Sequence, residues 1–285
     1  MTLFGVLSLP YPFDREYMQL ALLAGVLVGA TAPLVGVFLV EKRLSLMGDG
    51  IGHVAFAGVA AGLLAGVWPV WSALAVAIAG ALLLEWLRAR ERATGDLALA
   101  LVFYVGIAAG IVLLYKSDSG SVNVAPYLFG SVITLDTGDV GLVAGIAAAV
   151  LITFVLFGRA MFATVLDEES ARVAGIPVGF CNALLAVVTA VTVVAAMRAV
   201  GILLVAALMV LPVGSARLLA GSFRATVAWS SAIGMAAVVL GLIAARNLGL
   251  AAGGTIVLVA AMAFLVCAAV NGRRSSIQQT ARTDG

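Results

Sequence analysis

Long apolar runs, separated by short polar connections, make up most of this chain. They lie at about residues 18–40, 51–67, 70–87, 97–115, 139–157, 180–197, 199–216, 226–245 and 249–270. A helix needs about 20 apolar residues to cross a bilayer core of about 30 Å, and each run is close to that length. The pattern therefore predicts an all-α polytopic membrane protein with nine transmembrane helices, eight being the alternative count.

The amino-acid composition supports a membrane protein and indicates three segments along the chain. Hydrophobic residues make up 64% and charged residues 11% of the 285 residues, and the mean hydropathy is +1.19. We expect a short pre-membrane segment at 1–17, one transmembrane domain at 18–270 and a disordered cytoplasmic tail at 271–285. A net charge of +2 favours no nucleic-acid partner, and Cys181 and Cys267 lack metal-site spacing.

Basic residues between the runs predict the orientation in the membrane. Three connections are rich in arginine and are expected on the cytoplasmic side: Arg88, Arg90 and Arg92; Arg159 and Arg172; Arg273 and Arg274. Counting spans back from these places the N-terminus outside and the C-terminus inside. Arg198 and Arg246 then fall on the outer side, against the general bias.

Asp49 and the single histidine of the chain, His53, are the main candidate for chemistry. They are four residues apart, so a helix places both side chains on one face. Imidazole and carboxylate groups suit Zn, Mn or Fe, and two ligands fit a site that an ion enters and leaves. Two alternatives stay open: a proton relay, and a structural pair in which Asp49 caps a helix end.

A short polar segment separates the fifth and sixth runs. Leu166 to Pro177 reads as an amphipathic helix at the membrane surface, with acidic residues at its start and Gly175 near its end. Its small residues Ala171 and Ala174 could fit a groove in a partner. A plain connecting helix is the alternative.

Four segments, taken together and in order, resemble the zinc, manganese and iron ABC-transporter permease family. They are Glu41 to His53 (EKRLSLMGDGIGH), Pro126 to Ser131 (PYLFGS), Asp167 to Ile176 (DEESARVAGI) and Val200 to Pro212 (VGILLVAALMVLP). The resemblance covers nearly the whole chain. Gly50 and Gly52 depart from it, because relatives usually carry bulkier or hydroxyl residues there.

The resemblance implies the membrane subunit of a type II ABC importer in a prokaryotic plasma (inner) membrane. Such a subunit forms a homodimeric pathway for a divalent metal ion, with a cytoplasmic ATP-binding subunit and an extracytoplasmic metal-binding protein as partners. Asp49 and His53 match the metal-coordinating pair. The coupling segment that docks on the ATPase matches residues 164–178, with Asp167, Glu168, Ala171 and Gly175 as its key positions.

The residues themselves indicate that this chain is not an enzyme. It has no G-x-x-x-x-G-K-[ST] sequence, so ATP must be hydrolysed on another subunit, and no catalytic residue or permanently bound cofactor is expected. A proton-coupled secondary transporter and a permease for a metal chelate remain as alternatives. A membrane-embedded hydrolase is less favoured, because no His-Glu-x-x-His or Gly-x-Ser-x-Gly motif is present. The sequence does not choose among zinc, manganese and iron.

Overall fold

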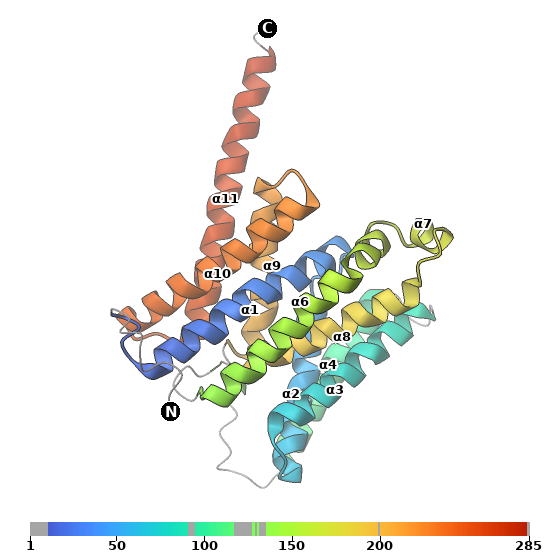
Figure 1. The fold of residues 1–285 in the computed structure, drawn as a ribbon, viewed down its shortest axis with the longest axis vertical. Helices are drawn as coiled ribbons and strands as arrows, with labels where there is room; N and C mark the ends of the chain where they lie inside the picture. The colour runs from blue at the N-terminus through green and yellow to red at the C-terminus, as the bar shows by residue number, and fades with distance from the viewer. Residues whose placement is uncertain are drawn as a thin grey trace.

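The computed structural model describes residues 11–90, 95–116, 127–128, 130, 135–198 and 200–283, and this part of the chain is helical without strands. Figure 1 shows most helices running side by side in one tilted bundle, with the C-terminal part of α11 standing away from it. The helices are α1 (Glu16–Glu41), α2 (Met47–Ala65), α3 (Pro69–Ala89), α4 (Gly95–Lys116), α6 (Thr137–Leu166), α7 (Glu168–Val173), α8 (Val178–Met197), α9 (Ile202–Leu219), α10 (Phe223–Leu248) and α11 (Ala252–Thr283).

The helices confirm the prediction of an all-α polytopic membrane protein. Within the described ranges, eight helices are long and apolar enough to cross a membrane: α1 to α4, α6, α8, α10 and α11. A ninth apolar helix, α9, corresponds to the run at 199–216, and its stretch Leu204–Leu219 is shorter. Each predicted run therefore forms a helix, and eight of them reach spanning length.

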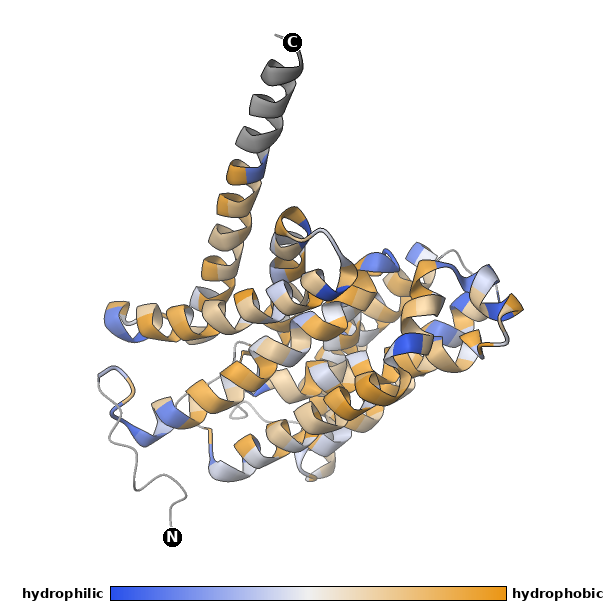
Figure 2. Ribbon diagram, turned by 45° about the horizontal axis from the view of Figure 1, so that its top comes forward, coloured by the Kyte–Doolittle hydropathy of each residue, from blue (hydrophilic) through white to orange (hydrophobic). Residues whose placement is uncertain are grey.

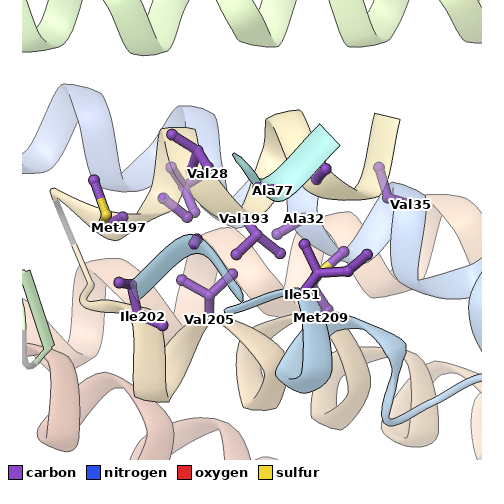
Figure 3. Packing of buried hydrophobic residues seen from close by; sticks show 14 of the residues in the cluster. Val28, Ala32, Val35, Ile51, Ala77, Val193, Met197, Ile202, Val205 and Met209 are labelled. Carbon is purple, nitrogen blue, oxygen red and sulfur yellow. The ribbon is translucent and has the colours of Figure 1, made fainter. Parts of the chain in front are cut away.

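Helix α2 is the most deeply buried of the candidate membrane spans. It contacts α3, α4, α8 and α9, and its apolar window is 72% buried, more than that of any other candidate span. Figure 3 shows the apolar core beside it, where Ile51 of α2 meets residues of α1, α3, α8 and α9. The buried members labelled there are Val28, Ala32, Val35, Ala77, Val193, Met197, Ile202, Val205 and Met209. The position of α2 is thus fixed by packing on several sides.

Close approach of α2 and α4 depends on a glycine. A Cβ atom added at Gly106 of α4 would lie 2.8 Å from the backbone nitrogen of Val54 and 3.0 Å from the carbonyl carbon of His53. Small residues let helix backbones approach in lipid, where van der Waals packing drives association. Gly106 therefore holds α4 directly against the second turn of α2.

Polar residues gather at the ends of the bundle. Figure 2 shows hydrophobic colour along the helices and hydrophilic colour around α7 and the helix ends beside it. We call this the α7 end; it includes Lys42, Arg88 and Glu168, together with Glu41 and Arg217, whose side chains pair at 3.3 Å. The α1–α2 connection reaches the same end, and α2 starts there.

The last helix, α11, extends into the segment at 271–285, for which a disordered cytoplasmic tail stays a prediction. Helix α11 continues past Asn271 to Thr283. An established helix extends at little further cost, and Arg, Gln and Ala in this segment are compatible with helix. Residues 1–10 of the predicted pre-membrane segment, Arg92, and residues 126, 129 and 131 of the segment at 126–131 lie outside the described residues.

Candidate metal-translocation site

Asp49 and His53 lie on the first two turns of α2. The Nε2 atom of His53 is 3.8 Å from Oδ1 of Asp49, and the two side chains are 16% and 33% exposed, respectively. This distance is too long for a hydrogen bond. It does allow one cation to contact both atoms, because metal–ligand distances to imidazole nitrogen and carboxylate oxygen are about 2.0–2.2 Å.

The structure does not place Asp49 as a helix cap. The N-cap residue of α2 is Leu46, it has no side-chain capping bond, and Asp49 is the third residue of the helix, inside its first turn. The residues from Gly48 to Gly52 are regular helix, so this glycine-rich stretch is neither a loop nor a re-entrant break. A carboxylate in the first turn is still favoured by the helix dipole.

Helix α4 forms the other wall of the site. The ring of Phe103 packs edge to face on the imidazole of His53, with ring centroids 4.5 Å apart. A pocket of about 230 Å³ lies between the two helices and is lined by Leu46, Asp49, Asp96, Leu99, Ala100, Phe103 and Tyr104. Asp49 therefore lines a small, mainly apolar pocket, and His53 is not among the residues that line it.

Asp96 is a pocket residue that the sequence analysis missed. It belongs to the first turn of α4, 47 positions beyond Asp49, and both carboxylates line the same pocket. The only signal in the sequence was an acidic residue at the start of an apolar run, which reads as a favourable helix start. Within the described ranges, no three His, Cys, Asp or Glu side chains are close enough to hold a metal together.

Two glycines that depart from the family pattern have neighbours in this structure. A Cβ atom added at Gly50 would lie 2.9 Å from Cδ1 of Leu99, and one added at Gly52 would lie 3.1 Å from Cγ2 of Ile202. The absence of side chains at both positions lets α4 and α9 pack closely around the turn that carries Asp49 and His53.

The predicted coupling segment forms the short helix α7. Asp167 is its N-cap and accepts hydrogen bonds from the backbone nitrogens of Glu169 and Ser170, at 2.9 and 3.2 Å. Its other oxygen accepts a bond of 2.6 Å from the Ser170 hydroxyl. The hydrogen bonds from Ser170 and Glu169 lower the pKa of Asp167, so this cap stays charged.

Gly175 ends α7 in the left-handed conformation, with φ of 78°. The nitrogen of Ile176 donates to the carbonyl of Ala171 at 3.0 Å, and Gly175 donates to Arg172 at 3.1 Å, which together form a Schellman motif. Gly175 therefore ends α7 where the sequence predicts the end of this helix.

The four predicted coupling residues do not share one outward face. Ala171 is 3% exposed and turns into the protein, and Glu168 contacts Lys42. The exposed residues of α7 are Glu169, Ser170, Arg172 and Val173, and the adjoining Ala174 is also exposed. Of the two small residues expected to meet a partner, only Ala174 is accessible.

Comparison with known proteins places the chain in a family. The model of the ABC 3 transport family matches residues 14–271. The manganese import system permease protein ScaB of Streptococcus gordonii is 30% identical over 253 residues, which cover 89% of this chain and 91% of ScaB. The manganese transport system membrane protein MntC of Halalkalibacterium halodurans is 30% identical, with 90% of this chain and 89% of MntC covered.

The fold agrees with a solved member. The structure of PsaBC from Streptococcus pneumoniae in complex with Fab matches with a TM-score of 0.80 and 31% identity, over 89% of this chain and 91% of that chain. The multi-pass helical fold, the ordered sequence motifs and the family match all agree. This chain therefore belongs to the ABC 3 transport family of metal-transporter permeases.

Proposed function

We propose that this chain is the membrane subunit of an ATP-driven importer of a divalent metal ion, with manganese as the first ion to test. The observation that carries the proposal is the pair of Asp49 and His53, whose ligand atoms are 3.8 Å apart beside a pocket. One carboxylate and one imidazole suit Mn²⁺, Fe²⁺ and Zn²⁺ alike. Two relatives with similar coverage are manganese permeases, which supports manganese.

The site binds its ion transiently during transport. Two ligands from one subunit leave coordination positions open, and water or a second copy of the chain fills them. Binding must be strong enough for entry and weak enough for release, which a two-ligand site satisfies better than a closed set of four. A homodimer with the pathway between its copies is part of this proposal.

Charge distribution supports a cytoplasmic location for the α7 end. Lys42, Arg88, Arg172 and Arg217 lie there, as the positive-inside rule requires of cytoplasmic connections. Arg198 and Arg246, which lie at the opposite end, are each paired with a carboxylate. Arg198 donates to Asp139 at 3.0 Å, and Arg246 is 3.4 Å from Asp14. The N-terminus is then outside and the C-terminus inside, in a prokaryotic inner membrane.

The orientation assigns the partners to their sides. A cytoplasmic ATP-binding subunit docks on the exposed face of α7, and an extracytoplasmic binding protein delivers the ion at the opposite end. ATP binding and hydrolysis on the partner then switch the pathway between outward and inward access. This subunit supplies the pathway and its transient ligands, and makes or breaks no covalent bond.

The energy source separates this function from a proton-coupled transporter. Radioactive manganese uptake is measured in a host that lacks its own manganese importers and its ATP synthase, and that expresses this chain with its ATPase and binding protein. In such cells an uncoupler removes the proton gradient while glycolysis maintains ATP. We expect uptake to continue with the uncoupler and to stop when ATP is depleted; the reverse result would establish proton coupling. Uptake of a manganese chelate with no uptake of free Mn²⁺ would indicate a chelate permease.

A further inference from the structure

A buried lysine connects α7 to the transmembrane helices. Lys42 is the C-cap of α1, and its side chain is only 5% exposed. Its ammonium group donates to Oε1 of Glu168 at 2.6 Å and to Oδ1 of Asn182 in α8. The amide of Asn182 donates to the same Glu168 oxygen at 3.2 Å. These three residues form a closed polar triangle, which we call the Lys42 clamp.

The surroundings of the clamp keep Glu168 ionised. Burial opposes the charge on Glu168, but the hydrogen bond and charge of Lys42, the amide of Asn182 and the charge of Arg88 outweigh it and lower the pKa of Glu168. Arg88 belongs to α3 and pairs with Glu85 at 2.9 Å. Elements α1, α3, α7 and α8 thus all contribute to the electrostatics of one spot at the α7 end.

A short connection with several backbone hydrogen bonds leads from Lys42 to the candidate metal site. Arg43 adopts a left-handed conformation with φ of 59°, and the nitrogen of Leu44 donates to the carbonyl of Leu39 at 2.8 Å. The nitrogen of Met47 then donates to the carbonyl of Leu44 at 2.9 Å, and α2 begins there. These hydrogen bonds hold the chain in a defined turn between the end of α1 and the start of α2.

From this geometry we infer that Lys42 is a positioning residue for coupling. The Lys42 clamp passes a movement of α7 through the connection of residues 43–46 to the first turns of α2, and so to Asp49 and His53. The inference rests on the proposed function and adds to it the route by which the ATPase side reaches the metal ligands. In this arrangement Glu168 contacts Lys42, and the exposed face of α7 is left to bind the ATPase.

The plain structural alternative is that the clamp merely holds α7 against the bundle. In that case its loss lowers the stability of the complex and the amount that assembles, while each assembled complex responds normally to substrate. The two roles therefore differ in the response of the assembled complex. A suitable measure is the stimulation ratio, which is ATP hydrolysis with metal-loaded binding protein divided by hydrolysis without it.

The test uses the complete complex of this chain with its ATPase, purified and reconstituted in nanodiscs. Lys42→Met and Glu168→Gln remove the charges with little change in shape, Lys42→Arg keeps the positive charge, and the double variant Lys42→Met with Glu168→Gln completes a double-mutant cycle. Lys116→Met is the control, because Lys116 is the other lysine of the chain and is exposed at the end of α4. Size-exclusion chromatography selects assembled complex before each assay.

We expect Lys42→Met and Glu168→Gln each to lower the stimulation ratio by about fivefold or more, which is the lower range of allosteric coupling. The double variant should be no worse than the worse single variant, and Lys42→Arg should regain most of the ratio. Normal stimulation ratios in assembled Lys42→Met and Glu168→Gln complexes would overturn the inference. Additive losses of the ratio in the double variant would also overturn it. If the variants assemble too poorly to assay while Lys42→Arg assembles but has a lowered ratio, charge alone does not explain the link and the inference also fails.

The wild-type complex separates this inference from the proposed function. A wild-type complex that no metal-loaded binding protein stimulates would count against the proposed function itself. A stimulated wild type together with normal Lys42→Met and Glu168→Gln variants would remove only the role of Lys42.

Discussion

The ammonium group of Lys42 lies 2.6 Å from the carboxylate of Glu168, although 126 residues separate them in the chain. This contact joins the end of α1 to the helix expected to meet the ATPase. Seven residues after Lys42, α2 carries Asp49. The candidate metal ligands and the candidate coupling helix are therefore connected through one short and hydrogen-bonded stretch of backbone.

The first prediction concerns the charge of Asp49, the proposed metal ligand. Asp49→Asn keeps the shape of the side chain and removes its negative charge, so uptake should fall on the order of tenfold or more, while the ATPase still co-purifies. Radioactive manganese uptake at several concentrations measures the loss. Glu16→Gln makes the same chemical change at an exposed position in the first turn of α1 and should leave uptake unchanged. Equal uptake in both variants would argue against Asp49 as a ligand.

The second prediction concerns the contact between α2 and α4. Gly106→Ala places a Cβ atom 2.8 Å from the backbone of Val54, so α4 must shift away from His53. Overpacking of this kind costs about 1–3 kcal/mol. Thermal unfolding of the purified protein should show a lower midpoint. Gly145→Ala in α6, where nothing lies within 4 Å, is the matched control and should be neutral or slightly stabilising. If both variants unfold at the same temperature, the close packing is not needed.

The third prediction concerns the end of α7. Gly175→Ala forces an alanine into a left-handed conformation with φ of 78°, at a cost of about 1–2 kcal/mol. Because this cost destabilises the Schellman motif, backbone hydrogen exchange in residues 168–173 should accelerate by about 5- to 30-fold. Mass spectrometry of the exchanged protein measures this directly. Gly179→Ala, in regular helix with open space around it, should leave exchange in α7 unchanged; a similar effect from both would refute the role of Gly175.

The fourth prediction concerns pH. The folded protein lowers the pKa of Glu168 below its ordinary value of 4.5, so the Lys42–Glu168 pair stabilises the folded state fully above that value. The contribution is lost as pH falls through the still lower pKa of the folded state. The difference in thermal midpoint between wild type and Glu168→Gln should therefore stay constant from pH 7 to about 5 and shrink below about 4.5. A difference that persists unchanged at the lowest attainable pH would show that the charge pair is not its source.

Local patterns in the sequence predicted much of this molecule. Each apolar run became a helix because segments of such length in lipid must satisfy their own backbone groups. Gly175 marked the end of α7 because left-handed helix ends favour glycine. The spacing of Asp49 and His53 placed them on one face because helical neighbours are four residues apart.

Contacts between distant segments could not be predicted in this way. Nothing local to Lys42 names Glu168 or Asn182 as its partners, since those contacts arise only when α1, α7 and α8 pack together. Asp96 shares a pocket with Asp49 for the same reason. Ala171 looked suitable for a partner surface, but the direction in which α7 docks on the bundle buries it.

The most direct test of the central claim is elemental analysis of cells. A host that lacks its own metal importers would express this chain with its ATPase and binding protein, and the cellular content of manganese, zinc and iron would be compared between wild type and His53→Ala. The account predicts accumulation of one of these metals, manganese first, which His53→Ala abolishes while the complex still assembles. Normal accumulation in the His53→Ala cells, or no accumulation of any metal by an assembled wild-type complex, would contradict it.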